Sequence, residues 1–506
     1  MIVMRKSKKI FLTTVLMSMI TVVSFTTGCG TGKKDDKAKD KSQDKIVQLS
    51  DDEQDDIYEG LFDINEKITI KIDMSDEEIR KIQEDYNEYM KTRSKSPIYR
   101  RADKVTFTIG DKEYVVEDVG VRMKGNTSRT DFYNLQTGKI YNLINLKMSF
   151  NETFDNKEYY GEDAVKWDSK EAKKERQNRR FAGLKKLELK ANKSEDQTFV
   201  RQYYGYEMFR ENGVPAPRSN IAQLCTEETN FGVFLINEPV DKIFIKRNFP
   251  EEEQGGDLYK VAWTNAPANY TKTMTYGCSD NEDGEKFNLD LKTNKSKSKN
   301  EMLEKFLGVI NNDAATKEDI LGVVDADNWV KFCAISYFTG NPDDFRNNYN
   351  NHYVYFAPNT GKAYFIPYDY DRCLGITKSW NPEGSGMTET SPFSDRAEGN
   401  RTKQSNPLIK KTILENGFLL EEYKSELGKI AASDWMSIDK FNSIYDIAKA
   451  NYDSVSVPDE KYQNIVQERQ IFSLEGEFIY GDDSTNMAVS DYFEGIMNSY
   501  NMYITQ

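Results

Sequence analysis

Residues Gly340–Gly375 read GNPDDFRNNYNNHYVYFAPNTGKAYFIPYDYDRCLG. Asp343 and Asp344 precede two short apolar runs joined by a Gly-containing turn, and Asp369 and Asp371 follow them. This pattern predicts a β-hairpin with acidic residues at both of its ends. Carboxylate and amide oxygens are the ligands that Mg²⁺ prefers, and phosphoryl transfer depends on positioning metal and phosphate. The stretch therefore predicts a Mg²⁺ site suited to phosphoryl transfer.

The order of the remaining elements predicts an α+β fold of two lobes. Alternating strands such as Lys67–Met74 and Asn142–Phe150 dominate the first half, and segments with helical periodicity dominate the second. We assign residues 66–240 to a β-rich N-lobe and residues 241–506 to a helical C-lobe that carries the acidic loops. The cleft is expected between the lobes, near Glu238–Asp241.

The N-terminus resembles a secretory signal. Residues 1–29 combine a basic start, an apolar stretch and a small residue before Cys29, which is similar to a bacterial lipobox. An ordinary cleaved signal or an N-terminal membrane anchor are the alternatives. Residues 30–65, which begin with a charged and low-complexity run, are predicted to be a disordered tether. These features predict a protein on the outer face of the membrane, anchored through lipidated Cys29.

Composition excludes several classes of function. The net charge of −14 argues against binding to nucleic acid. His352 is the only histidine, which removes most Ser-His-Asp and Cys-His schemes and, with no CxxC pair, makes a zinc site improbable. The four cysteines after Cys29 are widely spaced and fit either disulfides or buried thiols. The oligomeric state stays open.

Asp343 and Asn348 have the spacing D-x-x-x-x-N, at which protein kinases place a catalytic Asp and a metal-binding Asn. Asp369 leaves the second strand of the predicted hairpin, which is the place of the metal-chelating Asp in a kinase-like fold. The alternative is that Asp369 and Asp371 only cap a turn.

Val121–Ser128, VRMKGNTS, predicts a strand that enters a Gly-containing turn with cations and hydroxyls, which can hold phosphates. It is neither a GxGxxG nor a Walker A motif, and an ordinary hairpin turn is the alternative. Lys147 alternates with apolar neighbours, so it either points into the cleft toward the α- and β-phosphates or faces solvent.

At these residues the chain resembles the spore coat protein H (CotH) kinase family. The similar blocks, in the family's order, are DVGVRMKGNTSR, KKLELKA, VRQYYGYEMFRENGVPAP, NFGVFLINEPVDKIFIKRNF, GDLYK, GNPDDFRNNYNNHYVYF and FIPYDYDRCLG. They span residues 118–375. The resemblance implies an atypical secreted protein kinase with a bilobal kinase-like fold, Mg²⁺-ATP as donor, and Ser/Thr acceptors on spore coat or envelope proteins.

Roles follow from the resemblance position by position. It implies Asp343 as the catalytic base, although the register leaves Asp344 open, and it implies Asn348, Asp369 and Asp371 as metal ligands. The residues implied to hold the nucleotide are Arg122, Lys124, Gly125, Asn126 and Ser128 over its phosphates, Lys147 at the α/β-phosphates, and Glu238 in the hinge.

The sequence departs from the family pattern at Gln202 and Tyr368. Gln202 stands where the family often has the Glu that pairs with the lysine, and Glu207 on the same predicted helix is a possible substitute. Tyr368 replaces a common Trp, a change that we expect to be tolerated. Gln202 and the open source of ATP outside the cytoplasm keep a second function open, a catalytically weak pseudokinase or a structural lipoprotein of a spore coat or envelope assembly. A Mg²⁺ phosphohydrolase is the third possibility.

Overall fold

The fold is known from a computed structural model. It describes residues 49–126, 128–167, 169–192, 196–227, 229–264, 267–279, 286–376, 388–395, 406–456, 472–475 and 487–505. The predicted signal segment and Cys29 lie outside these ranges. Among the helices in these ranges, none has the length and apolar character needed to cross a membrane. The cysteines found there are free thiols.

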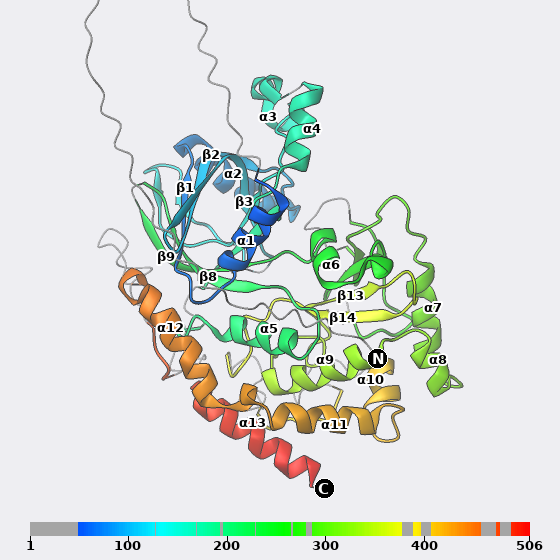
Figure 1. Cartoon of the computed structure of the whole chain (residues 1–506). Helices are drawn as coiled ribbons and strands as arrows, with labels where there is room; N and C mark the ends of the chain where they lie inside the picture. Colours follow the sequence, from blue (N-terminus) through cyan, green and yellow to red (C-terminus); the bar gives the residue numbers. More distant parts are fainter. Residues whose placement is uncertain are drawn as a thin grey trace, which may run out of the picture. The chain divides into compact units, whose positions relative to one another are not determined.

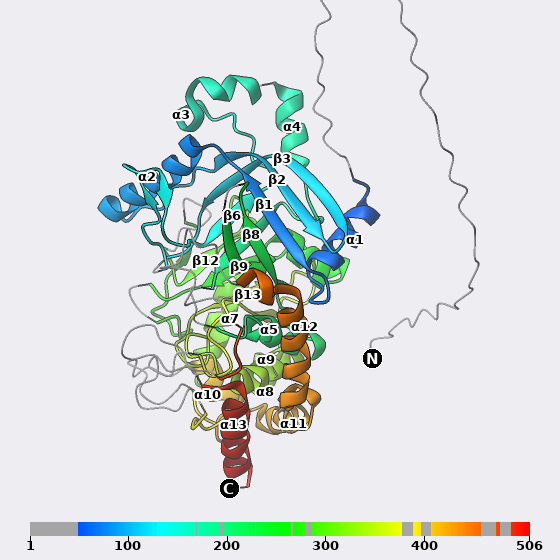
Figure 2. The ribbon, with the colours of Figure 1, turned by 90° about the vertical axis from the view of Figure 1, so that its left-hand side faces the viewer.

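The first half of the chain forms a closed barrel in the order β1-β2-β3-β6-β7-β9-β8 (Figures 1 and 2). Its strands are β1 (Ile68–Asp73), β2 (Arg100–Ile109), β3 (Lys112–Met123), β6 (Leu146–Ser149), β7 (Lys186–Ala191), β8 (Ser219–Cys225) and β9 (Asn230–Asn237). All neighbours pair antiparallel except β1 and β8, which are parallel and close the barrel. Alternation along the strands sends apolar side chains such as Val121, Met148 and Leu189 into one core.

Short elements surround the barrel. These are α1 (Asp51–Leu61), α2 (Asp76–Thr92), β4 (Tyr133–Asn134), β5 (Lys139–Ile140), α3 (Lys157–Tyr160), the 3₁₀ helix η1 (Gly161–Trp167) and α4 (Lys170–Asn178). Helix α1 corrects the predicted tether. Ser50 caps it through a capping box with Glu53, and Ile57, Tyr58 and Leu61 are buried. The disordered assignment of residues 30–65 therefore extended too far, because these apolar residues follow the charged run and pack on the barrel.

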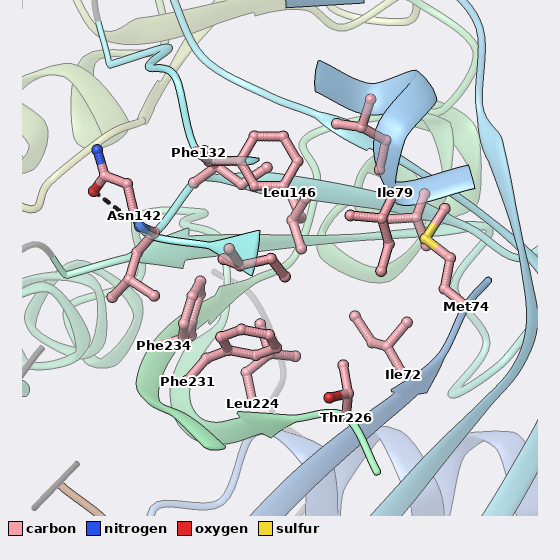
Figure 3. A pocket seen from close by; sticks show the side chains of 15 residues that line it. Ile72, Met74, Ile79, Phe132, Asn142, Leu146, Leu224, Thr226, Phe231 and Phe234 are labelled. Carbon is pink, nitrogen blue, oxygen red and sulfur yellow. Dashed lines mark hydrogen bonds between the residues drawn. The ribbon is translucent and has the colours of Figure 1, made fainter. Parts of the chain in front are cut away.

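The barrel keeps a small apolar cavity at one end, beside α2 (Figure 3). Its volume is about 70 Å³, and Ile79 of α2 lies over it while Leu146, Leu224 and Phe234 line it from the strands. Asn142 and Thr226 are the polar residues in its wall. The barrel interior is thus a nearly filled core and not the place of the acidic loops.

The second half contains a five-stranded sheet in the order β11-β12-β10-β13-β14, with helices beside it. The strands are β10 (Asp257–Val261), β11 (Tyr276–Gly277), β12 (Leu289–Leu291), β13 (His352–Phe356) and β14 (Ala363–Pro367). The helices are α5 (Arg201–Glu211), α6 (Lys242–Asn248), η2 (Glu251–Glu253), α7 (Glu301–Ile310), α8 (Lys317–Leu321), α9 (Ala326–Thr339), α10 (Pro407–Thr412), α11 (Leu420–Ala431), η4 (Asp434–Met436), α12 (Ile438–Ser456) and α13 (Val489–Ile504). The predicted α+β class, β-rich first and helical afterwards, is confirmed. The lobe boundary at residue 240 stays a prediction.

Helix α12 joins the helical half to the barrel (Figures 1 and 2). Tyr452 on this helix is fully buried, and its hydroxyl accepts a hydrogen bond from the Ile68 N–H (2.6 Å) and donates one to the Ile221 carbonyl (2.9 Å). Ile68 begins β1 and Ile221 lies on β8. One side chain of the helical half therefore bonds to both strands of the parallel pair that closes the barrel.

Candidate active site

The predicted hairpin forms as β13 and β14, and the loop after it carries the acidic pair. Asp369 has a left-handed backbone with φ of 57°. Lys190 of β7 reaches this loop, and its Nζ lies 2.5 Å from Asp369 Oδ1 and 2.5 Å from Asp371 Oδ2. The side chain of Asp369 is 38% exposed, whereas those of Asp371 and Lys190 are 16% exposed. The ammonium group of a barrel residue therefore bridges the two predicted metal-binding carboxylates.

The cations around Asp369 set its protonation. Burial, the largest single cause, would raise the pKa of Asp369, but the nearby lysines, with Lys190 first among them, together outweigh burial and hold the pKa well below its usual value. Lys124 and Lys260 act in the same direction. The effects on Lys190 have the opposite signs. Burial lowers the pKa of Lys190, but the two carboxylates raise it by more, so the net pKa lies above the usual value. Asp369 and Lys190 are therefore both charged at neutral pH.

The loop before β13 holds Asp343 in a cradle of asparagine amides. Asn348 Nδ2 (2.6 Å) and Asn350 Nδ2 (3.1 Å) donate to Asp343 Oδ1, and Asn351 Nδ2 donates to Oδ2 (2.9 Å). Burial is the main cause that raises the pKa of Asp343. The predicted D-x-x-x-x-N pair is thus in direct contact, which leaves Asn348 Oδ1 as a possible metal ligand beside the carboxylate.

Asn341 connects the two acidic loops. Its Oδ1 accepts from the Asp343 N–H (3.0 Å), and its Nδ2 donates to the Asp369 carbonyl (3.1 Å). Asn341 is fully buried, and both bonds are at least partly shielded from water. This bridge brings Asp343 and Asp369, which are 26 positions apart, into one assembly as the sequence predicted.

Asp344 has a structural position. Its Oδ1 accepts from the backbone N–H groups of Arg346 and Asn347 (2.9 Å each), and its side chain is 1% exposed. Burial raises the pKa of Asp344 to about 7. Burial closes this carboxylate off from a substrate hydroxyl, whereas Asp343 is only partly buried. The geometry thus favours Asp343 as the base and gives Asp344 the role of shaping the loop.

His352, the single histidine, supports the loop that carries Asp343 and Asp344. It is fully buried, and burial lowers its pKa to about 4. Its Nδ1–H donates to the Asn350 carbonyl (2.9 Å), so its Nε2 accepts from the Tyr270 hydroxyl (2.8 Å). A neutral histidine therefore positions one of the asparagines that hold Asp343.

Charged residues on the barrel lie side by side on three neighbouring strands. Arg122 pairs with Lys147, and Lys147 pairs with Glu188, so these side chains share the face opposite to the apolar core. Lys147 Nζ lies 3.5 Å from Glu188 Oε1, and Lys124 Nζ contacts Glu188 Oε2. Arg122 differs from the prediction, since it donates to the Ser96 carbonyl (3.1 Å) and lies over the Tyr99 ring. Lys147 and Lys124 therefore lie together at Glu188, whereas Arg122 packs against Ser96 and Tyr99.

The turn after β3 has the conformation that its glycine permits. Gly125 has φ of 112°, and a Cβ there would lie 2.2 Å from Ser128 Oγ. Asn145 Nδ2 donates to Ser128 Oγ (3.2 Å), and the Asn126 carbonyl accepts from the Arg129 N–H (3.3 Å). Predicted nucleotide-covering residues therefore form a compact turn next to Lys124.

Tyr368 links this turn to the acidic loop. Lys124 Nζ lies 5.4 Å and Lys260 Nζ 4.9 Å from the centre of its ring, and Asp369 is the next residue. Both amines lie within the range of a cation–π interaction. The barrel turn, β10 and the acidic loop thus converge at one place.

Glu238 does not join this group. Its backbone N–H donates to the Arg218 carbonyl (2.9 Å), and its Oε2 accepts from the Arg218 N–H (3.2 Å). Its side chain is buried and lies near Tyr58 of α1. The continuing β8–β9 pairing uses the N–H of Glu238, and the hinge assigned to Glu238–Asp241 stays a prediction.

The buried carboxyl of Glu238 makes a testable contribution to stability. Burial raises its pKa to about 7, well above the value of an unfolded chain. The native state then binds the proton more strongly, so this contribution is present at low pH and is lost as pH rises through about 7. We expect the unfolding free energy to fall by roughly 2 kcal/mol between pH 5 and pH 8 on this account. Urea unfolding of Glu238→Gln should show a flatter pH dependence than the unmodified protein, and equal slopes would contradict the assignment.

Sequence reasoning missed Lys190 and Glu188. Both lie in the block KKLELKA, where strand alternation places Glu188 and Lys190 on one face. Gln202, at the family's glutamate position, and Glu207, its predicted substitute, both have other partners. Gln202 Nε2 donates to Ser219 Oγ (3.1 Å) and Asn237 Oδ1 (2.5 Å), and Glu207 pairs with Arg210. The glutamate beside Lys147 therefore comes from β7 and not from the helix.

The donor set fits a divalent cation that is shared with phosphates. Within the described ranges no three His, Cys, Asp or Glu side chains are arranged as a complete metal site. Mg²⁺ often uses one or two carboxylates and takes its other ligands from water and substrate phosphates. The carboxylates of Asp369 and Asp371, which Lys190 bridges here, and the amide oxygen of Asn348 beside Asp343 are ligands of this kind.

Comparison with known proteins finds a curated relative. The chain is 29% identical over 205 residues to inner spore coat protein H of Bacillus subtilis (strain 168), which covers 39% of this chain and 52% of that protein. The chain thus spans about half the length of this curated relative.

A solved structure, the proinflammatory kinase CtkA of Helicobacter pylori, matches 53% of this chain and 88% of its own at 13% identity. The TM-score of 0.23 is too low to carry an argument about fold or function.

The match to a family model is more extensive. The model described as CotH kinase protein matches residues 144–461, which include the acidic loops, Lys147 and Lys190. This range is more than half of the chain. The protein therefore belongs to the CotH kinase protein family.

Proposed function

We propose that this protein is a Mg²⁺-ATP-dependent protein kinase that transfers phosphate to Ser or Thr hydroxyls. The observation that carries the proposal is the assembly of Asp343 and Asp369 through the buried side chain of Asn341, with Asp371 joined to Asp369 by Lys190. Membership in a family of kinases supports the reaction type. The cationic barrel face beside these carboxylates fits the phosphates of a nucleotide.

Each residue has a role that its contacts allow. Asp343 accepts the proton of the attacking hydroxyl, and its amide cradle orients the carboxylate toward the substrate. Asp369 and Asp371 hold the metal, whose charge would neutralise the phosphates when it is bound. Lys147, oriented by Glu188, and Lys124 bind phosphate oxygens from the barrel side.

The place of action is part of the proposal. The relative is named as an inner spore coat protein, which supports acceptors in a spore coat. The lipobox-like sequence before Cys29 supports anchoring to the outer face of the membrane through a lipid. Envelope proteins are the alternative acceptors.

Asp369→Asn tests nucleotide binding directly. A ligand at 100 times its dissociation constant stabilises the folded state by about 2.7 kcal/mol. We expect Mg²⁺-ATP to raise the melting temperature of the unmodified protein and to have little effect on Asp369→Asn, because the variant loses half of the carboxylate pair. Asp327→Asn, an exposed acid on α9, is the matched control and should respond like the unmodified protein.

A phosphotransfer assay completes the test. Labelled γ-phosphate should appear on the protein itself or on an added acceptor, with mass spectrometry locating it on Ser or Thr. Stabilisation by Mg²⁺-ATP without transfer would point to a pseudokinase or a structural role in a coat. Phosphate release without an acceptor would point to a phosphohydrolase, and no response to Mg²⁺-ATP would overturn the proposal.

A further inference from the structure

Lys190 occupies the position between two carboxylates that a metal would use. Its ammonium group is equidistant, at 2.5 Å, from Asp369 Oδ1 and Asp371 Oδ2. Mg²⁺ binds oxygen ligands at about 2.0–2.1 Å. A cation of either kind fits between these two oxygens, but an ammonium and a divalent ion within a few ångströms of each other would repel strongly. Metal binding to both carboxylates therefore requires Lys190 to move.

A second place for the ammonium lies next to it. Lys190, Asp371, Asp196 and Gln202 line a small pocket of about 10 Å³, together with Asn192 and the apolar Ala191 and Leu235. Gln202 is 1% exposed, and its Nε2 is fully engaged with Ser219 and Asn237. Its Oε1 is buried and has no hydrogen-bond partner. A buried acceptor without a donor costs about 1–3 kcal/mol, so a donor that arrives there is stabilised.

We propose that Lys190 is a positioning residue with two partners, which bridges Asp369 and Asp371 in the absence of metal and turns to Gln202 Oε1 when a divalent cation takes the carboxylates. This inference rests on the proposed function only for the identity of the metal-binding pair. The lysine keeps the two carboxylates together before the metal arrives, and the glutamine accepts the displaced amine. Gln202 is neutral, and the carboxylate of Asp196 in the same pocket is already paired with Arg201, so the second place holds Lys190 less strongly than the Asp369–Asp371 pair does.

The contacts also explain why this exchange of partners by Lys190 is confined to the site. Lys190 lies on β7 and its two carboxylates lie on the loop after β14, so the bridge joins the barrel to the second sheet. Gln202 lies on α5, and its amide group is fixed to β8 and β9 through Ser219 and Asn237. Only the flexible side chain of Lys190 has to change its rotamer.

The exchange predicts opposite effects of two neutral substitutions on metal binding. Lys190→Met removes the competing cation, so Mn²⁺ alone should bind about ten-fold more tightly than to the unmodified protein. Gln202→Met removes the second place for the amine, so Mn²⁺ should bind several-fold more weakly. The free Mn²⁺ signal in electron paramagnetic resonance measures both affinities without nucleotide and without turnover. Lys186→Met removes a positive charge from the same strand and should leave the affinity unchanged.

The outcomes separate this inference from the proposed function. Mn²⁺ affinity that is equal or weaker in Lys190→Met, or unchanged in Gln202→Met, would overturn the exchange. If Lys190→Met does not fold, Lys190→Gln gives the same comparison with a side chain that can still hydrogen-bond. The exchange stands if the two affinities move in opposite directions even when Mg²⁺-ATP gives no phosphotransfer. Retained Mn²⁺ binding in Asp369→Asn would instead show that the metal binds elsewhere and would overturn both.

Discussion

Asp343→Asn should abolish phosphate transfer while the protein stays folded. An asparagine keeps the shape of the side chain and can accept from Asn348, but it cannot take a proton from a hydroxyl. Loss of a general base typically costs 10²- to 10⁴-fold in rate, so we expect a fall of about 10³-fold. Radiolabelled phosphate transfer at saturating Mg²⁺-ATP measures this loss. Thermal unfolding should show only a modest loss, of about 1–2 kcal/mol, because one amide donor loses its acceptor.

Asp344→Asn is the informative contrast. Its carbonyl oxygen can still accept from the backbone N–H groups of Arg346 and Asn347, so the loop should keep its shape. We expect transfer per folded molecule to stay within a few-fold of the unmodified protein. If Asp344→Asn loses transfer and Asp343→Asn keeps it, then Asp344 is the base and the assignment is reversed.

Arg201→Met should cause a large loss of stability. Arg201 is 2% exposed and donates to the carbonyls of Leu374 (2.9 Å) and Met487 (2.8 Å). It also lies 3.4 Å from the buried carboxylate of Asp196. Breaking a buried ion pair by removing one partner typically costs 3–5 kcal/mol, since the other charge remains buried. We therefore expect urea unfolding to show a loss of about 4 kcal/mol.

Arg210→Met near the end of the same helix is the matched control. Arg210 pairs with Glu207 at the surface, where its side chain is 29% exposed. Surface pairs of this kind contribute about 0–1 kcal/mol. Similar losses for the two variants would mean that the bonds of Arg201 to residues 374 and 487 do not matter for the folded state.

Sequence patterns predicted those parts of the site that depend only on residues close together in the chain. The hairpin was expected at Tyr353–Phe356 and Ala363–Pro367, and the observed strands are His352–Phe356 and Ala363–Pro367. Alternation of apolar residues and a turn around Gly361, where φ is 68°, are sufficient for this outcome. The contact between Asp343 and Asn348 also follows from five positions of spacing within one loop.

The partners of the site could not be predicted in the same way, because they depend on barrel closure. Lys190 and Asp369 are 179 positions apart, and nothing near either residue indicates the other. Arg122 alternates with apolar residues as Lys147 does, yet a neighbouring tyrosine ring takes its guanidinium group. Glu238 follows a strand as a hinge residue would, but pairing of β8 with β9 continues through it. Long-range packing decided each of these cases.

The bond of Tyr452 to Ile68 and Ile221 has a consequence for the order of folding. The parallel junction between β1 and β8, here called the seam, receives two hydrogen bonds from Tyr452, which lies 384 positions after Ile68. During synthesis, the barrel strands leave the ribosome long before α12 does, so the seam stays without these bonds until about nine-tenths of the chain exists. Contacts between residues so distant in sequence form slowly, because a long loop must close first. A nascent chain that ends before Tyr452 should therefore be sensitive to protease at β1, and completion of α12 should protect it.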